Sequence, residues 1–411
     1  YRAVHTSLFS FMLLPNHSIV SVTDPLVQLA FTLPTAATYL NTFLATSSAS
    51  SNIVGSSLVD WNELALALAL AMTSSSSSSS TSTVVAAAAT SAAMGLIAGY
   101  CYRSVTACTD HKQVPASLYK SDYGRELKLA VQLAREAGSN MVEYMEAKGT
   151  DAESSLDLGI ETKSGFADIC TKVDVENERL VIDGIRSVFP DHQIIGEESV
   201  GTGALPELDP DVPTWIIDPI DGTTNFSSGL HSLTCVSIGF CVGGRPVVGV
   251  VYAPGTNELY VGVDGCGAYR NGRRLWQDPE RSIKTISGSV VCNEMGYTRD
   301  PEHLAILQGA QTRVMLEGCK AMRQIGSGCL DLCFVASGRL DVVYAGLCTE
   351  GWKPWDYAAS LVICREAGCT MESIEAQTID GCDGFDLYST SILCGVSKAL
   401  VDEMRPVLLN K

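Results

Sequence analysis

The feature that most constrains this chain is a run of twelve residues, WIIDPIDGTTNF, at 215–226. Its first three residues are apolar and have the pattern of a short buried strand that leads into Asp218. Pro219 fixes φ and has no N–H for a strand ladder, so we expect the chain to turn there. Asp221 follows, and Gly222 then lets the backbone approach a ligand closely. The run therefore predicts two carboxylates at a strand end, beside the start of a helix that is well capped by Thr-Thr-Asn.

Such a pair of carboxylates predicts a site that binds a cation and a phosphate together. The free amides at a helix start attract anions, while oxygen ligands of this kind suit Mg²⁺, which keeps waters and bridges to phosphate oxygens. The net charge of the chain is −18. An acidic surface repels nucleic acid, which sets nucleic-acid binding aside, and it also repels phosphate esters unless a metal supplies positive charge.

Two further acidic clusters lie at 194–199 (IIGEES) and 355–359 (WDYAA). Each places a carboxylate, Glu197 or Asp356, at the end of an apolar segment, where a strand or helix terminus can orient it. Taken singly, each cluster has a plainer interpretation, as a turn, a solvated helix start or a helix cap. The three in combination are therefore what carries the functional hypothesis.

The three clusters together resemble the inositol monophosphatase family, whose signature is a GEE cluster, a W-[IV]-[IV]-D-P-[IL]-D-G-T-T-N-[FY] run and a late W-D-x-A-A. The resemblance covers roughly residues 118 to 405. It implies a mixed α/β fold, a layered αβαβα sandwich of the sugar-phosphatase type. We expect two halves, 117–270 and 271–411, with the metal site between them and Asp356 contributed by the second half.

The resemblance implies a Mg²⁺-dependent phosphomonoesterase acting on a small polyol phosphate, with inositol monophosphate as the first candidate. Hydrolysis would proceed by direct attack of a metal-activated water. A 3′(2′),5′-bisphosphate nucleotidase and other sugar or histidinol phosphate phosphatases remain alternatives, as does a membrane-tethered pseudophosphatase scaffold outside the enzymes. Lithium sensitivity and a homodimer are further expectations from the resemblance.

The resemblance also assigns roles to individual positions. It implies two to three Mg²⁺ ions bound by Glu197, Asp218, the Ile220 carbonyl, Asp221 and Asp356. The phosphate and the polyol would be bound by Asp221, Gly222, Thr223, Thr224, Gly326, Ser327 and Gly328. Glu197 and Thr223 would activate the attacking water, and Asp174 would orient the Thr223 hydroxyl. Lys163 and Ser164 match the family's mobile loop, which closes over the site.

The stretch before Trp355 departs from the family pattern. The family's substrate-contacting glutamate follows a tyrosine-rich strand, whereas here Tyr344 is followed by Ala345, and the segment up to Pro354 is longer. The sequence leaves open whether Glu350 replaces that glutamate. Recognition of the inositol ring is therefore open.

Two other phosphatase chemistries fit the sequence less well. Residues 333–339 (CFVASGR) satisfy the C-x5-R spacing of cysteine phosphatases, but their apolar pattern predicts a buried helix with Gly338 at its end. A haloacid dehalogenase site needs two aspartates separated by one residue, and Asp218 and Asp221 are separated by two. The 15 cysteines lie at scattered positions without zinc-binding spacing. Their odd number, with no disulfide framework, predicts reduced thiols in a reducing compartment.

Hydrophobic periodicity outlines the secondary structure of the globular part. Apolar residues at helical spacing predict helices over 125–146 and 175–188. Apolar runs predict strands at 234–242 and 246–252, joined by a Gly-Gly hairpin turn.

Residues 1–116 are a low-charge, Ser/Ala-rich region outside the resemblance, and we expect it to be partly disordered. The uncharged stretch 84–102 is long enough to span a bilayer. A membrane anchor, a targeting region or neither remain open. The compartment, cytoplasmic or organellar, is open for the same reason.

Overall fold

The computed structural model describes residues 113–155, 157–165, 167–278, 285–348, 352–375 and 385–410. All of them belong to the unit Thr106–Lys411. The predicted span at 84–102 and the candidate Glu350 lie outside the described residues. Within these ranges, none of the helices combines the length and the apolar character needed to cross a bilayer.

Two long helices, α6 (Gly124–Ala147) and α7 (Lys172–Val188), confirm the predicted helical periodicity. The apolar stripe of α6, which includes Leu127, Val131 and Met141, is fully buried. A capping box between Thr171 and Asp174 fixes the start of α7. The short 3₁₀ helices of the described chain are Leu118–Lys120, Asp151–Ser155 and His231–Leu233.

The first large sheet has seven strands in the order β3-β4-β5-β6-β7-β8-β9. Their bounds are β3 (Gln193–Gly196), β4 (Thr214–Asp221), β5 (Cys235–Val242), β6 (Arg245–Ala253), β7 (Glu258–Val263), β8 (Gly267–Arg270) and β9 (Arg273–Leu275). The β3–β4 pair is parallel, and the following pairs are antiparallel. Gly243 and Gly244 both have positive φ at the β5–β6 turn, as the predicted two-residue hairpin requires.

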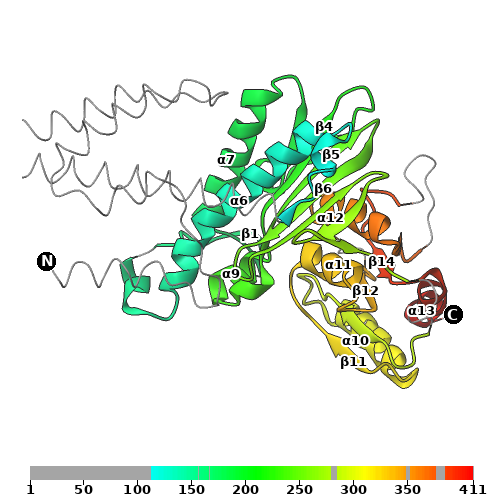
Figure 1. The fold of residues 1–411 in the computed structure, drawn as a ribbon. Helices are drawn as coiled ribbons and strands as arrows, with labels where there is room; N and C mark the ends of the chain where they lie inside the picture. Colours follow the sequence, from blue (N-terminus) through cyan, green and yellow to red (C-terminus); the bar gives the residue numbers. More distant parts are fainter. Residues whose placement is uncertain are drawn as a thin grey trace, which may run out of the picture. The chain divides into compact units, whose positions relative to one another are not determined.

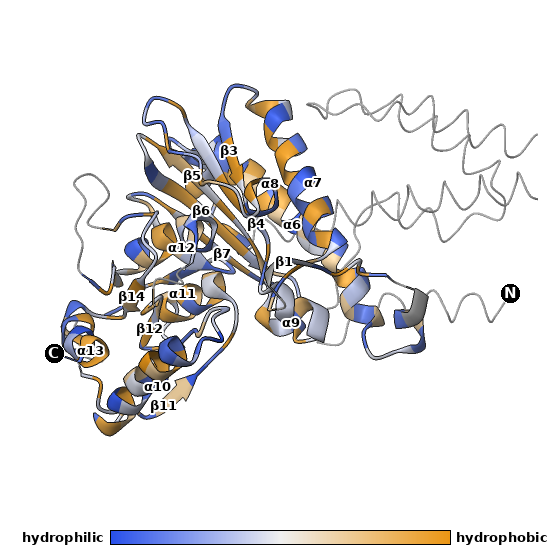
Figure 2. Cartoon of the chain, turned by 180° about the vertical axis from the view of Figure 1, so that it is seen from behind, coloured by the Kyte–Doolittle hydropathy of each residue, from blue (hydrophilic) through white to orange (hydrophobic). Residues whose placement is uncertain are grey.

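Helices cover both faces of this sheet (Figure 1). α6 and α7 pack on one face, and α12 (Pro354–Ala367) packs on the other. Side chains on β4 alternate between the two cores: Trp215 and Ile217 join the α6–α7 side, whereas Ile216 joins the α12 side. Because both faces are covered, the strands are predominantly hydrophobic (Figure 2).

The second large sheet has five strands in the order β11-β10-β12-β14-β13. Their bounds are β10 (Val290–Asn293), β11 (Ala321–Arg323), β12 (Val342–Ala345), β13 (Thr370–Glu372) and β14 (Ile392–Gly395). α11 (Gly328–Ala336) lies beside α12 between the sheets, and α10 (Pro301–Leu316) and α13 (Lys398–Leu409) form the outer layer (Figure 1). The layers are therefore αβαβα, which confirms the predicted fold.

The predicted boundary between the halves lies beside the end of the first sheet. β8 ends at Arg270, but β9 extends the same sheet to Leu275, and the second sheet begins at Val290. The division into functional halves stays a prediction.

The middle layer approaches the first sheet unusually closely, and this approach positions the start of α12. Gly239, Gly249 and Gly262 are cross-strand neighbours on β5, β6 and β7. A Cβ at Gly249 would lie 2.0 Å from the carbonyl oxygen of Ala359 in α12. The three glycines form a side-chain-free track for α12, whose first turn carries Asp356.

Candidate active site

A β-bulge in β4 places the side chains of Asp218 and Asp221 on the same face of the strand, although three residue steps separate them. Asp218 pairs with Ser237 and Asp221 pairs with Cys235, with a register irregularity between them. The prediction that the chain turns at Pro219 is wrong in this respect, because β4 continues to Asp221. A bulge accommodates Pro219, since the extra residue needs no ladder hydrogen bond.

Three aspartates converge at the end of β4. Asp218, Asp221 and Asp356 each place a carboxylate oxygen within 4.8 Å of the others. Asp218 and Asp221 are buried, and Asp218 Oδ1 has no hydrogen-bond partner among the described residues. Asp356 lies in the first turn of α12, where its Oδ2 accepts the N–H of Lys353 at 2.5 Å.

This arrangement of charge fits a divalent cation. Burial raises the pKa of Asp218 and of Asp356, and the neighbouring carboxylates raise both further. Burial also raises the pKa of Asp221. The three carboxylates, of which those of Asp218 and Asp221 are buried, repel one another unless protons or a cation neutralise them. Hard oxygen donors of this kind are the ligands that Mg²⁺ takes. Asp218 Oδ1, a buried oxygen without a hydrogen-bond partner among the described residues, fits the role of a metal ligand.

Glu197 has a different partner. It opens the short helix α8 (Glu197–Val200), and its Oε1 accepts the ammonium of Lys163 at 2.8 Å. Lys163 lies in the hairpin of β1 (Glu161–Gly165) and β2 (Asp168–Cys170) and also bonds Glu198 Oε1 at 2.7 Å. Burial raises the pKa of Glu197 to about 7, although Lys163 opposes that shift. The Lys163 ammonium is thus the positive charge paired with Glu197. Ser164, the other residue assigned to the mobile loop, lies in the same strand, β1.

A second polar unit forms around Thr223, the first residue of α9 (Thr223–Ser228). The Thr223 hydroxyl lies 3.0 Å from Asp174 Oδ1 and 3.0 Å from the Ile220 carbonyl oxygen. Asp174 is fully buried, and burial raises its pKa to about 6. Gly222 precedes this unit with φ +87°, and a Cβ there would meet the Leu233 carbonyl oxygen at 2.8 Å. Only glycine suits that position.

Ser327 and Gly328, which belong to the segment 326–328 predicted to contact a polyol, donate hydrogen bonds to Asp221. Ser327 Oγ donates to Asp221 Oδ2 at 2.5 Å, and Gly328 N–H donates to Asp221 Oδ1 at 3.1 Å. The side chain of Ser327 is buried, whereas Thr224, also assigned to the substrate, is exposed on α9. The roles of these residues toward a substrate stay predictions.

Sequence reasoning missed three residues that tie the site together through backbone groups. Glu294 Oε1 accepts the N–H groups of Ile325 and Gly326 at 2.8 and 2.9 Å. Asn225 Nδ2 donates to the Ile325 carbonyl oxygen at 2.8 Å. Glu178 accepts the N–H of Glu198 at 2.7 Å. For Glu178 a signal existed, because it is an acidic residue on the buried stripe of α7.

The alternative cysteine site is part of the core. Cys333 is fully buried within α11, and Gly338 follows the end of that helix with φ +68°. The prediction that CFVASGR is a structural helix end is confirmed, because no phosphate could reach a thiol in that position.

Comparisons with known proteins agree with this geometry. The model of the inositol monophosphatase family matches residues 122–407. The chain is 36% identical over 271 residues to inositol monophosphatase 1 of Sus scrofa, covering 66% of this chain and 89% of that protein. It is 41% identical over 285 residues to Nus factor SuhB of Haemophilus influenzae, covering 69% and 96%. The crystal structure of extragenic suppressor protein SuhB from Bartonella henselae superposes with a TM-score of 0.57 at 26% identity, covering 69% of this chain and 98% of that one.

Proposed function

We propose that this chain, which belongs to the inositol monophosphatase family, is a Mg²⁺-dependent phosphatase of a small polyol phosphate, with inositol monophosphate as its first candidate substrate. Membership makes it a metal-dependent phosphoric monoester hydrolase that acts on small phosphate esters. The observation that carries the finer proposal is the convergence of the buried Asp218 and Asp221 with the half-buried Asp356, where Asp218 Oδ1 has no hydrogen-bond partner among the described residues.

These three aspartates would hold Mg²⁺, and Glu197 and the Ile220 carbonyl would complete the ligands of two to three ions. Bound there, Mg²⁺ would offset the phosphate charge and lower the pKa of a water. Lys163 would release Glu197 when the β1–β2 hairpin moves, which is the role proposed for Lys163 and Ser164. While the hairpin is in the described position, the Lys163 ammonium neutralises the carboxylate of Glu197.

Thr223 and Glu197 are the residues proposed to orient and deprotonate the attacking water. The Thr223 hydroxyl donates its one hydrogen bond to Asp174 or to the Ile220 carbonyl and keeps its proton, so the lone pairs of its oxygen can accept a hydrogen bond from that water. Glu197, with its pKa raised to about 7, can take the water's second proton near neutral pH. The water oxygen then bonds phosphorus as the bond from phosphorus to the polyol oxygen breaks. The leaving oxygen finally takes a proton from solvent.

The names of relatives support the choice of substrate. The Sus scrofa relative is named inositol monophosphatase 1 and aligns over 89% of its length. The backbone N–H groups of Gly222 and Thr223 are the proposed phosphate ligands, and Asp221 is the proposed contact to the polyol. Homodimer formation and lithium inhibition belong to the same proposal. Analytical ultracentrifugation and a lithium titration of the activity test them separately.

Phosphate release across a substrate panel tests the proposed function. The panel holds inositol 1-phosphate, galactose 1-phosphate, histidinol phosphate, fructose 1,6-bisphosphate and adenosine 3′,5′-bisphosphate. We expect Mg²⁺-dependent turnover with the highest kcat/KM for inositol 1-phosphate. A higher value for adenosine bisphosphate would establish the nucleotidase alternative. Folded protein without turnover of any substrate would favour the scaffold.

A further inference from the structure

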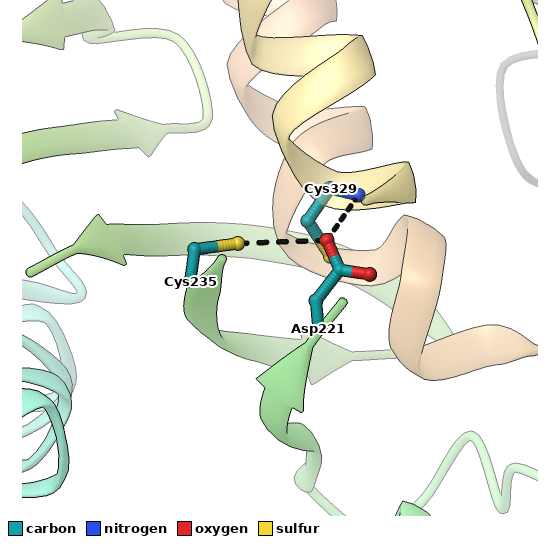
Figure 3. A group of neighbouring side chains, drawn as sticks. All are labelled: Asp221, Cys235 and Cys329. Atoms are coloured by element: carbon teal, nitrogen blue, oxygen red, sulfur yellow. Dashed lines mark hydrogen bonds between the residues drawn. The ribbon is translucent and has the colours of Figure 1, made fainter. Parts of the chain in front are cut away.

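Asp221 has two cysteine neighbours that reach it from different layers of the fold. Cys235 opens β5 and is the cross-strand partner of Asp221. Cys329 is the second residue of α11, and its N–H donates to Asp221 Oδ2 at 2.8 Å. Figure 3 shows the sulfur of Cys235 and the backbone nitrogen of Cys329 directed at this carboxylate. The Cys329 thiol itself donates to the carbonyl oxygen of Asp356 at 3.4 Å. Both cysteines are free thiols and fully buried.

The donor atoms lie close enough together for a tetrahedral metal site. Cys235 Sγ lies 3.5 Å from Asp221 Oδ2, and the two Sγ atoms and a carboxylate oxygen of Asp221 all lie within 4.8 Å of one another. Zn²⁺ binds sulfur at about 2.3 Å and oxygen at about 2.0–2.2 Å. Tetrahedral angles then place sulfur and oxygen donors about 3.5 Å apart and two sulfurs about 3.8 Å apart. Ser327 Oγ, 4.0 Å from Cys235 Sγ, is the nearest oxygen for the fourth position among the described contacts of that thiol.

The chemistry of this donor set differs from that of the aspartate group beside it. Thiolates select zinc and cadmium over magnesium, whereas the three aspartates offer oxygen alone. A buried thiol usually packs as a small apolar side chain. Here, however, each thiol contributes a donor atom to one group with a carboxylate, and the two come from segments far apart in the sequence.

We propose that Asp221, Cys235 and Cys329 form an inhibitory site for a thiophilic divalent cation such as Zn²⁺ or Cd²⁺. Binding forms two metal–sulfur bonds and one metal–oxygen bond and releases the two thiol protons to solvent, with no change of oxidation state. The inhibition rests on the proposed function, because that function assigns Asp221 to Mg²⁺. Two divalent cations on one carboxylate repel each other, so occupancy of the sulfur site weakens Mg²⁺ binding.

Cadmium binding by the metal-free full-length chain tests the site without any assay of activity. The readout is the ultraviolet charge-transfer band of cadmium thiolate, compared between wild type and the variants Cys235→Ala, Cys329→Ala and Cys329→Ser. We expect each variant to bind one Cd²⁺ fewer than wild type. Cys333→Ala is the matched control, because Cys333 lies one helical turn further along α11 and is equally buried.

Zinc inhibition tests the consequence. Relative to each protein's own Mg²⁺-activated rate, we expect the half-inhibitory zinc concentration to rise at least about tenfold in Cys329→Ala, since losing even a supporting partner costs about 10–100-fold in metal affinity. In wild type it should also rise with Mg²⁺ concentration, because both ions need Asp221.

The outcomes separate this site from the proposed function. Unchanged cadmium stoichiometry in the Cys235 and Cys329 variants overturns the site. Loss of the cadmium band in Cys292→Ala instead also overturns it, because Cys292 lies with Glu294 and Asp331 in a different group. The expected cadmium result without turnover of any phosphate ester supports the site and overturns the proposed function. Zinc inhibition that is equal in wild type and Cys329→Ala overturns the inhibitory role.

Discussion

Replacing Glu294 tests how the site holds Asp221 in place. Glu294 follows β10, and its Oε1 accepts the N–H groups of Ile325 and Gly326. The same segment continues through Ser327 to the start of α11, where three hydrogen bonds reach Asp221. Glu294 is thus a positioning residue that acts on a proposed metal ligand through this segment.

The expected loss follows from the two hydrogen bonds. Glu294→Ala leaves the partly buried Ile325 N–H without its acceptor, at a cost of about 1–3 kcal/mol. The Gly326 N–H is exposed, so water replaces the carboxylate there at little cost. The free energy of unfolding should therefore fall by about 1–3 kcal/mol, and the half-activating Mg²⁺ concentration should rise about 10–100-fold. Glu294→Gln keeps the Oε1 acceptor and should stay within about 1 kcal/mol of wild type.

Urea denaturation and Mg²⁺ activation curves measure the two effects. The control is Glu302→Ala, which removes an exposed glutamate from the first turn of α10 and should change neither quantity measurably. Wild-type Mg²⁺ activation in Glu294→Ala would refute the proposal that Glu294 positions Asp221. An equal loss in Glu294→Gln would show that the charge matters rather than the acceptor.

Three further predictions concern stability and pH. Asp218→Asn should stabilise the metal-free protein against urea while lowering kcat/KM, since it removes a buried carboxylate that the carboxylates of Asp221 and Asp356 repel; destabilisation would contradict the described carboxylate group. Gly249→Ala should lower the free energy of unfolding by about 1–3 kcal/mol, because its Cβ would lie 2.0 Å from the Ala359 carbonyl oxygen. Unchanged stability would show that α12 can shift away from the sheet at little cost. Folding raises the pKa of Glu197 to about 7 and of Asp174 to about 6, so the folded state binds more protons than the unfolded state between about pH 4 and 7. The Tm of metal-free protein should therefore fall as pH rises through that window, and a rise would contradict both shifts.

The long helices and the hairpin turn were predictable, because residues close together in the sequence determine them. Helical periodicity located α6 and α7, and the Gly243-Gly244 pair located the β5–β6 hairpin. The Asp-Pro-x-Asp run placed two carboxylates at a strand end. Its bulge was missed, because pairing of Asp221 with Cys235 depends on the neighbouring strand rather than on Pro219 alone.

Features that depend on distant segments were accessible only through the family resemblance or through the structure. The resemblance linked Asp174 to Thr223, and the structure places their oxygen atoms 3.0 Å apart. Neither periodicity nor spacing connects Cys235 with Cys329, because a strand and a helix from different parts of the chain bring them to one carboxylate. Glu294 escaped for a similar reason, since it acts on backbone amides that carry no sequence signature.

The most direct test of the account is the rate of phosphate release from inositol 1-phosphate as a function of Mg²⁺ for wild type and Asp356→Asn. The account predicts no turnover after chelation of divalent cations and a saturable rise with Mg²⁺ in wild type. It predicts a loss of at least about 100-fold in kcat/KM, about 2.7 kcal/mol, in the variant. Turnover that survives chelation, or a variant with near wild-type activity, would contradict the assignment of Asp218, Asp221 and Asp356 as the metal centre.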